Sequence, residues 1–327
     1  MDVAGLTQEL TQPLVSVLAA QYGPAVTVAN LRRDSGGASR VTCAFDAQFA
    51  GETRPLILRM TPPGATQRAG VGLTQEAALM RAAAAAGVPT PAVIADGGAD
   101  GPLGAEYVVM ERVDGETIPR RVLRSPELAD VRPRLAAQCG EILAAIHRIT
   151  PDDVPGLDAS DPVASWRAVL DTLGEPHPAL EFALRRLLRD RPPAGPRAVV
   201  HGDFRNGNLI VGPGGVRAVL DWELAHLGDP LEDLGWLCVK AWRFGSPLPV
   251  GGFGSYDDLV AAYEKAGGGP VDRAALRWWE TFGIFKWAVM CGLQAERHLI
   301  GGERSVELAA IGRRVAENEW DLLHRLP

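Results

Sequence analysis

Three side chains that carry oxygen lie close together in one short stretch of the sequence, residues 199–223. Asp203 follows a short apolar run, Asn208 comes five residues later, and Asp221 ends a second apolar run. Two strands joined by a glycine-rich turn would place Asn208 and Asp221 at the same end of a hairpin, beside Asp203. We expect these oxygens to converge with no basic side chain among them. Such a set suits phosphoryl transfer, in which one carboxylate accepts a hydroxyl proton while an amide and a second carboxylate hold Mg²⁺ against ATP phosphates.

A simpler interpretation is a polar loop between buried strands, in which Asp203 and Asn208 stabilise turns and Asp221 caps a helix. The full pattern is more restrictive, because His-Gly-Asp at 201–203 precedes Asn208, the hairpin and the closing Asp221. It resembles the catalytic loop and metal loop of the aminoglycoside phosphotransferase family, relatives of the protein kinases. The run Gly-Asp-Pro-Leu-Glu-Asp-Leu at 228–234 also matches this family. The nearest branch is related to the phosphotransferase domain of acyl-CoA dehydrogenase fusion proteins.

The resemblance implies an α+β, protein-kinase-like fold with two lobes. Residues 1–113 would form a small nucleotide-binding lobe, an antiparallel sheet with one helix. Residues 114–327 would form a larger, mainly helical lobe for catalysis and substrate binding. The residues themselves predict strands at 26–31, 41–45, 56–60, 93–94 and 107–110, and helices at 6–22, 74–86, 134–148, 166–172, 180–191, 231–242, 256–266, 273–299 and 305–323.

Two local predictions accompany this division into elements. Thr74 can cap the start of the helix that follows it, because a threonine hydroxyl accepts from the first free backbone N–H groups of a helix. The segment 244–254 is rich in glycine and proline. We therefore expect it to be an exposed loop.

A kinase also needs a cation on the nucleotide phosphates, held in place by an acid. The first 239 residues contain no lysine, so this cation must be an arginine. Strand alternation in 56–60 separates Arg59 from Leu56, Leu58 and Met60 and would turn it toward a nucleotide cleft. The family usually has lysine at this position, and arginine is frequent in the branch named above. The alternative is an edge-strand arginine in solvent.

The resemblance assigns roles to further residues. Glu76 would orient Arg59, although it could instead be an exposed glutamate favoured by the helix dipole. His201 and Asp233 would brace the catalytic loop, and Glu223 would lie close to the metal. The turn that covers the phosphates would contain Ser35, Gly36, Gly37 and Ser39. The hinge, whose backbone would bind adenine, would contain Met110, Glu111 and Val113.

The bulk properties narrow the range of partners. The net charge is −7 and no basic stripe is present, so we expect no nucleic-acid partner. No apolar stretch is long enough to span a bilayer, and the first residues do not resemble a signal peptide. The four cysteines lie far apart, which argues against a zinc site or a disulfide framework. A reducing cytoplasm is therefore the expected compartment, and the oligomeric state is left open.

The acceptor is predicted from residues 240–327, which should build the outer wall of the substrate site. They contain 11 acidic and 11 basic residues, whereas a pocket for a polycationic aminoglycoside needs uncompensated carboxylates. In and just before this region lie Trp236, Trp242, Trp278, Trp279 and Trp287, with Arg243, Arg277 and Lys286 interspersed. The simpler interpretation is that most of these tryptophans fill the core. As a mixture, these residues suit an acceptor with an apolar body and an anionic end, such as a hydroxyacyl thioester. The alternatives are an aminoglycoside kinase, a pseudokinase that binds nucleotide, and a hydrolase using Asp203 and His201.

Overall fold

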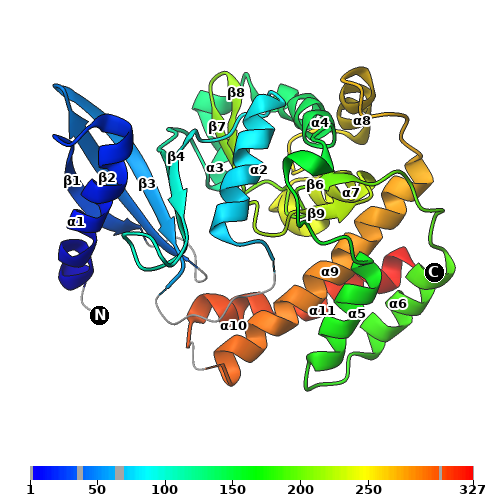
Figure 1. The fold of residues 1–327 in the computed structure, drawn as a ribbon. Helices are drawn as coiled ribbons and strands as arrows, with labels where there is room; N and C mark the ends of the chain where they lie inside the picture. Colours follow the sequence, from blue (N-terminus) through cyan, green and yellow to red (C-terminus); the bar gives the residue numbers. More distant parts are fainter. Residues whose placement is uncertain (1–2, 35–39, 63–69, 302–303, 327) are drawn as a thin grey trace.

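The computed structural model describes residues 3–34, 40–62, 70–301 and 304–326. It has the kinase-like, two-lobed α+β architecture expected from the sequence (Figure 1). An antiparallel sheet forms one side of the molecule, and the remainder is mainly helical. The predicted fold class is therefore confirmed.

The small lobe is built on a five-stranded antiparallel sheet with the strand order β1-β2-β3-β5-β4. The strands are β1 Thr27–Asp34, β2 Val41–Phe49, β3 Glu52–Met60, β4 Val93–Gly97 and β5 Tyr107–Glu111. Strand β3 lies between β2 and β5, and Arg59 is opposite Thr42 on one side and Val108 on the other. The alternative of an edge-strand arginine is therefore wrong.

Each face of the sheet packs against a different helix. Helix α1 (Val3–Tyr22) covers one face, where Leu14 and Leu18 pack with Leu56 and Leu58 of β3. Helix α2 (Leu73–Ala85) lies on the other side, between the sheet and the larger lobe (Figure 1). Its buried residues pack both with β5 and with the core of the larger lobe. Helix α2 therefore carries its side chains to the seam between the lobes.

The start of α2 differs from the prediction. The cap residue is Gly72, and Thr74 does not cap the helix with its own hydroxyl. Instead the Glu106 carboxylate accepts a hydrogen bond from the backbone N–H of Thr74 at 3.0 Å and another from its hydroxyl. A carboxylate from the segment before β5 thus binds the free N–H groups and complements the helix dipole.

The larger lobe contains nine α-helices in the described part of the chain. They are α3 Pro119–Arg124, α4 Leu135–Ile146, α5 Pro162–Thr172, α6 Pro178–Arg189, α7 Leu231–Cys238, α8 Tyr256–Lys265, α9 Arg273–Leu299, α10 Val306–Gly312 and α11 Val315–Arg325. Two short antiparallel pairs accompany them: β6 Ala198–Val200 with β9 His226–Gly228, and β7 Leu209–Gly212 with β8 Gly215–Val219. None of the described helices is long and apolar enough to cross a membrane.

Two predicted helices are wrong in their extent. The helix expected at 231–242 ends at Cys238 and is followed by a 3₁₀ turn, Lys240–Arg243. The helix expected at 305–323 is split into α10 and α11. At this break Gly312 packs so closely on α9 that a side-chain carbon added to it would lie 2.7 Å from Ala295.

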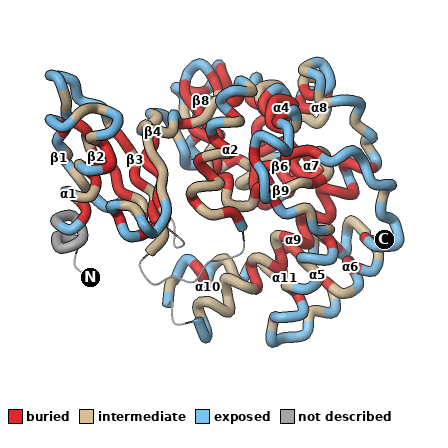
Figure 2. The backbone as a smooth tube through the Cα atoms, in the orientation of Figure 1, coloured by how far each residue is buried: buried red, intermediate tan, exposed pale blue. Residues whose placement is uncertain are grey.

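The segment 244–254 is only partly the exposed loop that was predicted. Val250 is 0% exposed and Phe253 is 2% exposed. Both belong to the core of the larger lobe, whose buried residues are red in Figure 2. The side-chain amide of Asn206 donates to the carbonyl oxygen of Gly251 at 2.8 Å. The end of the segment is therefore fixed against the loop that carries Asp203.

Most of the tryptophans expected to line an acceptor site are instead part of a second hydrophobic core. Trp236, Trp242, Trp278 and Trp279 are each less than 9% exposed and pack with α5, α6 and α9. Periodic aromatic residues in a long helix more often fill a core than line a cavity, and that is their role here. The predicted tryptophan wall is therefore wrong.

Candidate active site

Asp203 lies in the loop between β6 and β7, and its carboxylate is held by neighbouring side chains. The side-chain nitrogen of Asn208 is 2.6 Å from Oδ2 of Asp203 and 3.0 Å from its backbone oxygen. Both of these partners are acceptors, so the amide nitrogen of Asn208 must face Asp203. The amide oxygen of Asn208 therefore faces away and is available to another ligand.

Two further donors contact Asp203. Nε of Arg205 is 3.0 Å from Oδ1, and its guanidinium lies 4.5 Å from the centre of the Trp242 ring. The indole N–H of Trp236 donates to the same Oδ1 at 2.8 Å. The expectation that no basic side chain lies among these oxygens is wrong, because the tight loop turns Arg205 back over the carboxylate two residues before it.

Asp221 is positioned by the β7–β8 hairpin. Leu209 lies opposite Val219, and the N–H of Leu220 donates to the carbonyl oxygen of Asn208 at 2.8 Å. Asn208 and Asp221 therefore meet at one end of the hairpin, as the sequence predicts. Asp221 has a positive φ of 68°, a left-handed conformation that costs free energy for a residue other than glycine. Such strain is typical of functional positions.

Arg59 joins the two lobes at this point. Its Nη1 is 2.8 Å from Oε2 of Glu76 on α2, and its Nη2 is 3.1 Å from Oδ1 of Asp221. Burial lowers the pKa of the Arg59 guanidinium, but the two carboxylates outweigh this effect and raise it above the usual value. Arg59 is therefore a fixed cation between Glu76, its predicted partner, and Asp221, a contact that was not predicted.

Glu76 is completely buried, and nearby cations only partly balance the negative charge of its carboxylate. Burial raises its pKa to about 7, because the attraction of Arg59 does not fully offset the loss of water around the carboxylate. Oε1 has no hydrogen-bond partner in the described part of the chain, and Nη2 of Arg40 lies 3.7 Å from it. Glu223 behaves in the same direction, since burial and the nearby Asp221 raise its pKa. The alternative of an exposed helix glutamate at position 76 is wrong.

We call residues 201–208, between β6 and β7, the catalytic loop, after the loop of the family that they resemble. Two buried residues, His201 and Asp233, fix its conformation. Asp233 on α7 accepts hydrogen bonds from the N–H groups of His201 at 2.7 Å and Gly202 at 2.9 Å. Nε2 of His201 lies 3.0 Å from the carbonyl oxygen of Leu220, and its Nδ1 lies 3.2 Å from the N–H of Asp203. Burial lowers the pKa of His201 and favours the neutral imidazole that can accept this N–H.

Gly202 is required by this arrangement. Its φ is +77°, and a side-chain carbon at this position would lie 2.2 Å from the carbonyl oxygen of Leu224. Any other residue would force the catalytic loop away from the segment that follows Asp221.

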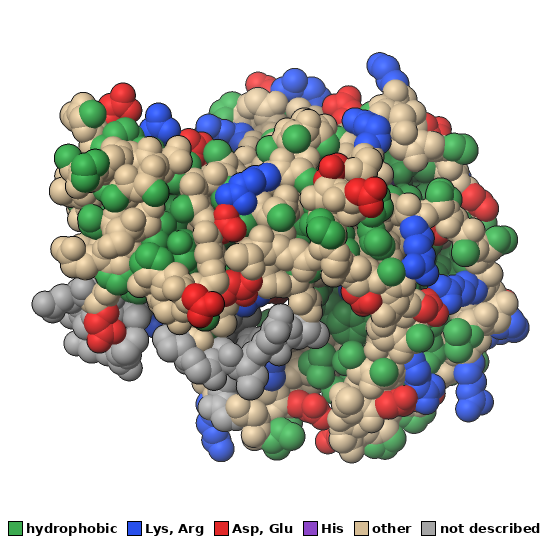
Figure 3. All heavy atoms as spheres, in the orientation of Figure 1, with side chains coloured by type: hydrophobic (Ala, Val, Ile, Leu, Met, Phe, Trp, Pro, Cys, Tyr) green, Lys and Arg blue, Asp and Glu red, His purple; other side chains and the backbone are tan. Residues whose placement is uncertain are grey.

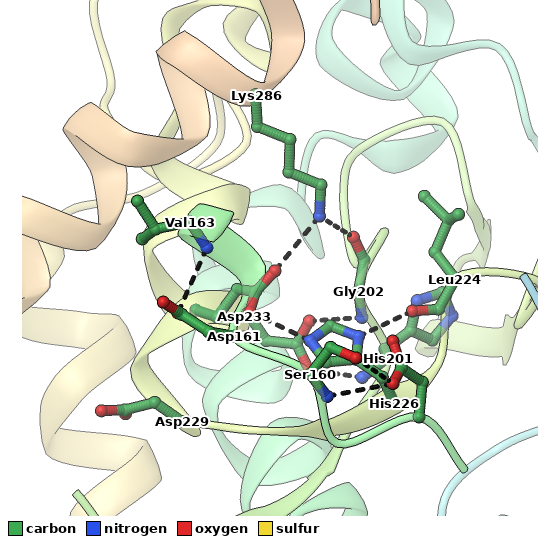
Figure 4. A network of polar contacts seen from close by, with 12 residues as sticks. Ser160, Asp161, Val163, His201, Gly202, Leu224, His226, Asp229, Asp233 and Lys286 are labelled. Carbon is green, nitrogen blue, oxygen red and sulfur yellow. Dashed lines mark hydrogen bonds and ion pairs between the residues drawn. The ribbon is translucent and has the colours of Figure 1, made fainter. Parts of the chain in front are cut away.

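A second brace was not foreseen from the sequence. Nζ of Lys286 on α9 donates to the carbonyl oxygen of Gly202 at 2.8 Å and lies 3.2 Å from Oε1 of Glu232 (Figure 4). Glu232 also contacts Nε2 of His226 at 3.1 Å. Burial raises the pKa of Glu232, but Lys286 and His226 outweigh it and lower the pKa overall. Lys286 lies more than 80 residues after the loop, so no local signal could connect them.

The hinge begins with Met110 and Glu111, the last two residues of β5. The predicted phosphate-covering turn (Ser35, Gly36, Gly37 and Ser39) lies outside the described residues. Met110 and Glu111 are opposite Ile57 and Leu56 of β3. The backbone N–H of Glu111 donates to the carbonyl oxygen of Ala92, and that of Arg112 donates to the carbonyl oxygen of Pro55. Val113 is the first residue of the hinge whose N–H has no backbone partner within the described chain.

A cavity of about 980 Å³ is lined by residues of the segments 118–120, 240–247 and 314–321. None of its described lining residues belongs to the loop that carries Asp203, but Pro119 in its wall would lie 3.4 Å from a side-chain carbon added to Gly207 of that loop. The charged residues of its wall are Arg120, Lys240, Arg243, Arg314, Glu317 and Asp321. Asp321 forms an ion pair with Lys240, and Glu317 lies 3.2 Å from Arg314. Both acidic groups are therefore already compensated by basic ones.

The fold and this site define a kinase-like phosphotransferase. The model of the "Phosphotransferase enzyme family" matches residues 30–279, and the chain belongs to this family. The acyl-CoA dehydrogenase family member 11 of Gallus gallus is 28% identical over 91% of the chain, which spans only 41% of that protein.

Solved structures show the same fold. A Ralstonia eutropha JMP134 protein assigned as an aminoglycoside phosphotransferase is 22% identical, with a TM-score of 0.72 over 97% of this chain and 98% of that one. A variant of aminoglycoside phosphotransferase APH(4)-Ia, solved with ADP and hygromycin B, is 19% identical, with a TM-score of 0.60 over 96% of this chain and 97% of that one.

Proposed function

We propose that this protein transfers the γ-phosphoryl group of Mg-ATP to a hydroxyl group of a small molecule. The observation that carries the proposal is the meeting of Asp203, Asn208 and Asp221 with the Arg59–Glu76 pair across the two lobes. Phosphoryl transfer asks for little covalent chemistry from the protein. It depends on positioning and on neutralising charge, which this set of groups can supply.

Asp203 would orient the acceptor hydroxyl and accept its proton. Its carboxylate is fixed by Asn208, Arg205 and Trp236, yet 11% of the side chain is exposed. An acceptor would have to reach Asp203 from that exposed side. A base held in this way typically contributes roughly 10²–10⁴-fold to the rate.

Asn208 and Asp221 would hold Mg²⁺. No described group of three His, Cys, Asp or Glu side chains is arranged to bind a metal ion, but Mg²⁺ commonly uses one or two protein ligands and completes its shell with phosphates and water. The residues fit this need, since the oxygen of Asn208 faces away from Asp203 and 34% of the Asp221 side chain is exposed. The ion would neutralise phosphate charge, and Arg59 would bind phosphate oxygens through its planar guanidinium.

For the acceptor, we propose a molecule with an apolar body and an anionic end, such as a hydroxyacyl thioester. The cavity supports this class, because its two acidic residues are paired with Lys240 and Arg314 and offer nothing to a polycation. On the face shown in Figure 3, acidic and basic side chains are interspersed. That mixture favours a small-molecule partner over nucleic acid.

Two alternatives and one compartment complete the proposal. An aminoglycoside kinase is the second candidate, because a protein of the same fold was solved with hygromycin B. A pseudokinase is a weaker one, since Asp203, Asn208 and Asp221 are all in place.

All four cysteines are buried free thiols, which supports a reducing cytoplasm.

The test is an acceptor screen with γ-labelled ATP and Mg²⁺. We expect label on a hydroxyacyl thioester and negligible label on kanamycin-like compounds. Efficient phosphorylation of the polycation at micromolar KM would overturn the acceptor class and leave the reaction class intact. Binding of Mg-ATP without label on any hydroxyl acceptor would favour the pseudokinase.

A further inference from the structure

We propose that Trp236 is a positioning residue, whose indole N–H fixes the Asp203 carboxylate for reaction. The inference rests on the proposed function, because it concerns the residue that would act on the acceptor. Trp236 lies on α7, and its Nε1 is 2.8 Å from Oδ1 of Asp203. It is 1% exposed, so this contact is shielded from water.

Trp236 differs from the other two donors to Asp203. Asn208 has the metal as a second proposed partner, and Arg205 lies on the loop itself with 24% of its side chain exposed. The Trp236 N–H points only at the carboxylate and belongs to a helix of the core. It is therefore the one donor among the three whose position does not depend on nucleotide or acceptor.

Two side chains pack against the indole ring. Nζ of Lys286 lies 4.6 Å from the ring centre, a cation–π contact, and the Trp242 ring lies 5.2 Å away. The same Lys286 donates to Gly202, so it joins Trp236 to the catalytic loop. Helix α7 packs tightly on α9, because a side-chain carbon on Gly235 would lie 2.7 Å from the backbone nitrogen of Glu280.

The hydrogen bond is also unusual among the tryptophans of this protein. The indole nitrogens of Trp222, Trp242, Trp279 and Trp287 are buried without a hydrogen-bond partner among the described residues. Trp278 donates to a backbone carbonyl, that of Leu187 at 3.0 Å. The protein thus leaves several indole N–H groups unpaired, yet aims one at the proposed catalytic carboxylate.

The test replaces Trp236 with phenylalanine, which keeps most of the ring and removes the N–H. We expect kcat to fall by about 10- to 100-fold, since hydrogen bonds to charged groups are strong. The KM for Mg-ATP should stay within about twofold. The loss should therefore appear in kcat and not in nucleotide binding, because the N–H acts on the residue that would meet the acceptor.

The split between kcat and KM is specific because the substitution leaves the charged neighbours in place. Arg205, which contacts Asp203, and Lys286, which lies over the Trp236 ring, are both kept in Trp236→Phe. A loss that came only from poorer packing would also disturb Asn208 on the same loop and raise the KM for Mg-ATP, and this result would overturn the proposal.

Trp279→Phe is the matched control. Trp279 is also buried, at 4% exposed, and its indole nitrogen has no partner among the described residues. This variant should keep the wild-type kcat and the wild-type KM for Mg-ATP. An equal loss of kcat in both variants would show that ring size, not the N–H, matters, and would overturn the proposal.

A measurement on folded wild-type protein covers the case in which Trp236→Phe does not fold. The protein has eight tryptophans, and their indole N–H signals can be followed by ¹⁵N NMR. Asp203→Asn should shift one of these signals far more than the other seven, because only one indole N–H donates to that carboxylate. If all of the signals shift alike, the proposal is wrong. If wild-type protein shows no phosphotransfer at all, the proposed function has failed instead.

Discussion

Asp233 and Glu76 are both fully buried carboxylates of this site, but their surroundings have opposite effects. Burial raises the pKa of each. At Asp233 this effect is outweighed by His147 and by the N–H groups of His201 and Gly202, so its pKa lies below the usual range. At Glu76 burial wins over Arg59, and the pKa is about 7. Hydrogen bonds to both oxygens of a buried carboxylate, rather than a single ion pair, decide whether it stays charged.

This difference separates the two halves of the site. The loop half, with Asp203 and Asn208, rests on a carboxylate whose oxygens are both satisfied. The sheet half, with Arg59, rests on a glutamate that has one oxygen without a hydrogen-bond partner in the described chain. We infer that the loop half is preorganised, while the sheet half responds to pH and to phosphates.

The largest expected effect is on turnover in the loop half. Asp203→Asn should lower kcat by roughly 10²–10⁴-fold, while the Kd for Mg-ATP stays close to the wild-type value. The reason is that Asp203 acts on the acceptor and not on the nucleotide. Steady-state kinetics and calorimetric titration would measure the two quantities. A variant retaining more than about a tenth of wild-type kcat would contradict the assigned role.

The next effect concerns stability and compares two matched substitutions. Asp233→Asn should lower the free energy of unfolding by about 3–5 kcal/mol. The reason is that Asp233 uses two side-chain oxygens to accept from the two loop N–H groups, whereas asparagine has only one. Glu76→Gln at pH 4 should change it by less than about 1 kcal/mol, since the glutamate is then mostly protonated in both the folded and the unfolded protein. Urea unfolding would measure both. Equal losses of unfolding free energy in the two variants would mean that Asp233 and Glu76 do not differ in charge state.

The pH dependence of stability should show the contrast with opposite signs. The pKa of Glu76 is raised from 4.5 to about 7 on folding, so its contribution is present below pH 4.5 and is lost as the pH rises through 7. Relative to Glu76→Gln, wild-type stability should fall by ~3 kcal/mol over that range. The pKa of Asp233 is lowered, so its contribution is lost only as the pH falls. Parallel curves for wild type and Glu76→Gln would contradict this account.

The smallest expected effect is on nucleotide binding. Arg59→Ala should raise the KM for ATP by about tenfold, and Glu76→Ala should do so more mildly. Because the two side chains are 2.8 Å apart, the double variant should be sub-additive. Additive effects in the double-mutant cycle would mean that Glu76 does not orient Arg59.

Much of the fold could be predicted because its signals are local. Strand alternation placed Arg59 correctly, and the hairpin turn placed Asn208 beside Asp221. The misplaced features depend on distant contacts. The break before α11 reflects packing of Gly312 on Ala295, and the buried end of 244–254 reflects the bond from Asn206. Neither contact leaves a periodic pattern in the sequence.

The site shows the same limit. The residues of one loop and hairpin carry a compact motif, so Asp203, Asn208 and Asp221 could be named together. Lys286 and Trp236 reach the loop from α9 and α7, and in the sequence they look like ordinary residues of apolar helices. Only the packing of α7 on α9 shows that they serve the catalytic loop.

The most direct test of the central claim is a single-turnover reaction followed by ³¹P NMR, with wild-type protein, ATP and a hydroxyacyl thioester. With Mg²⁺ present, we predict one phosphate-ester signal on the acceptor and an equal amount of ADP. With the metal chelated, neither should form. ADP and free phosphate in equal amounts, with no ester on any hydroxyl acceptor, would contradict the claim that the two halves of this site transfer a phosphoryl group to an alcohol.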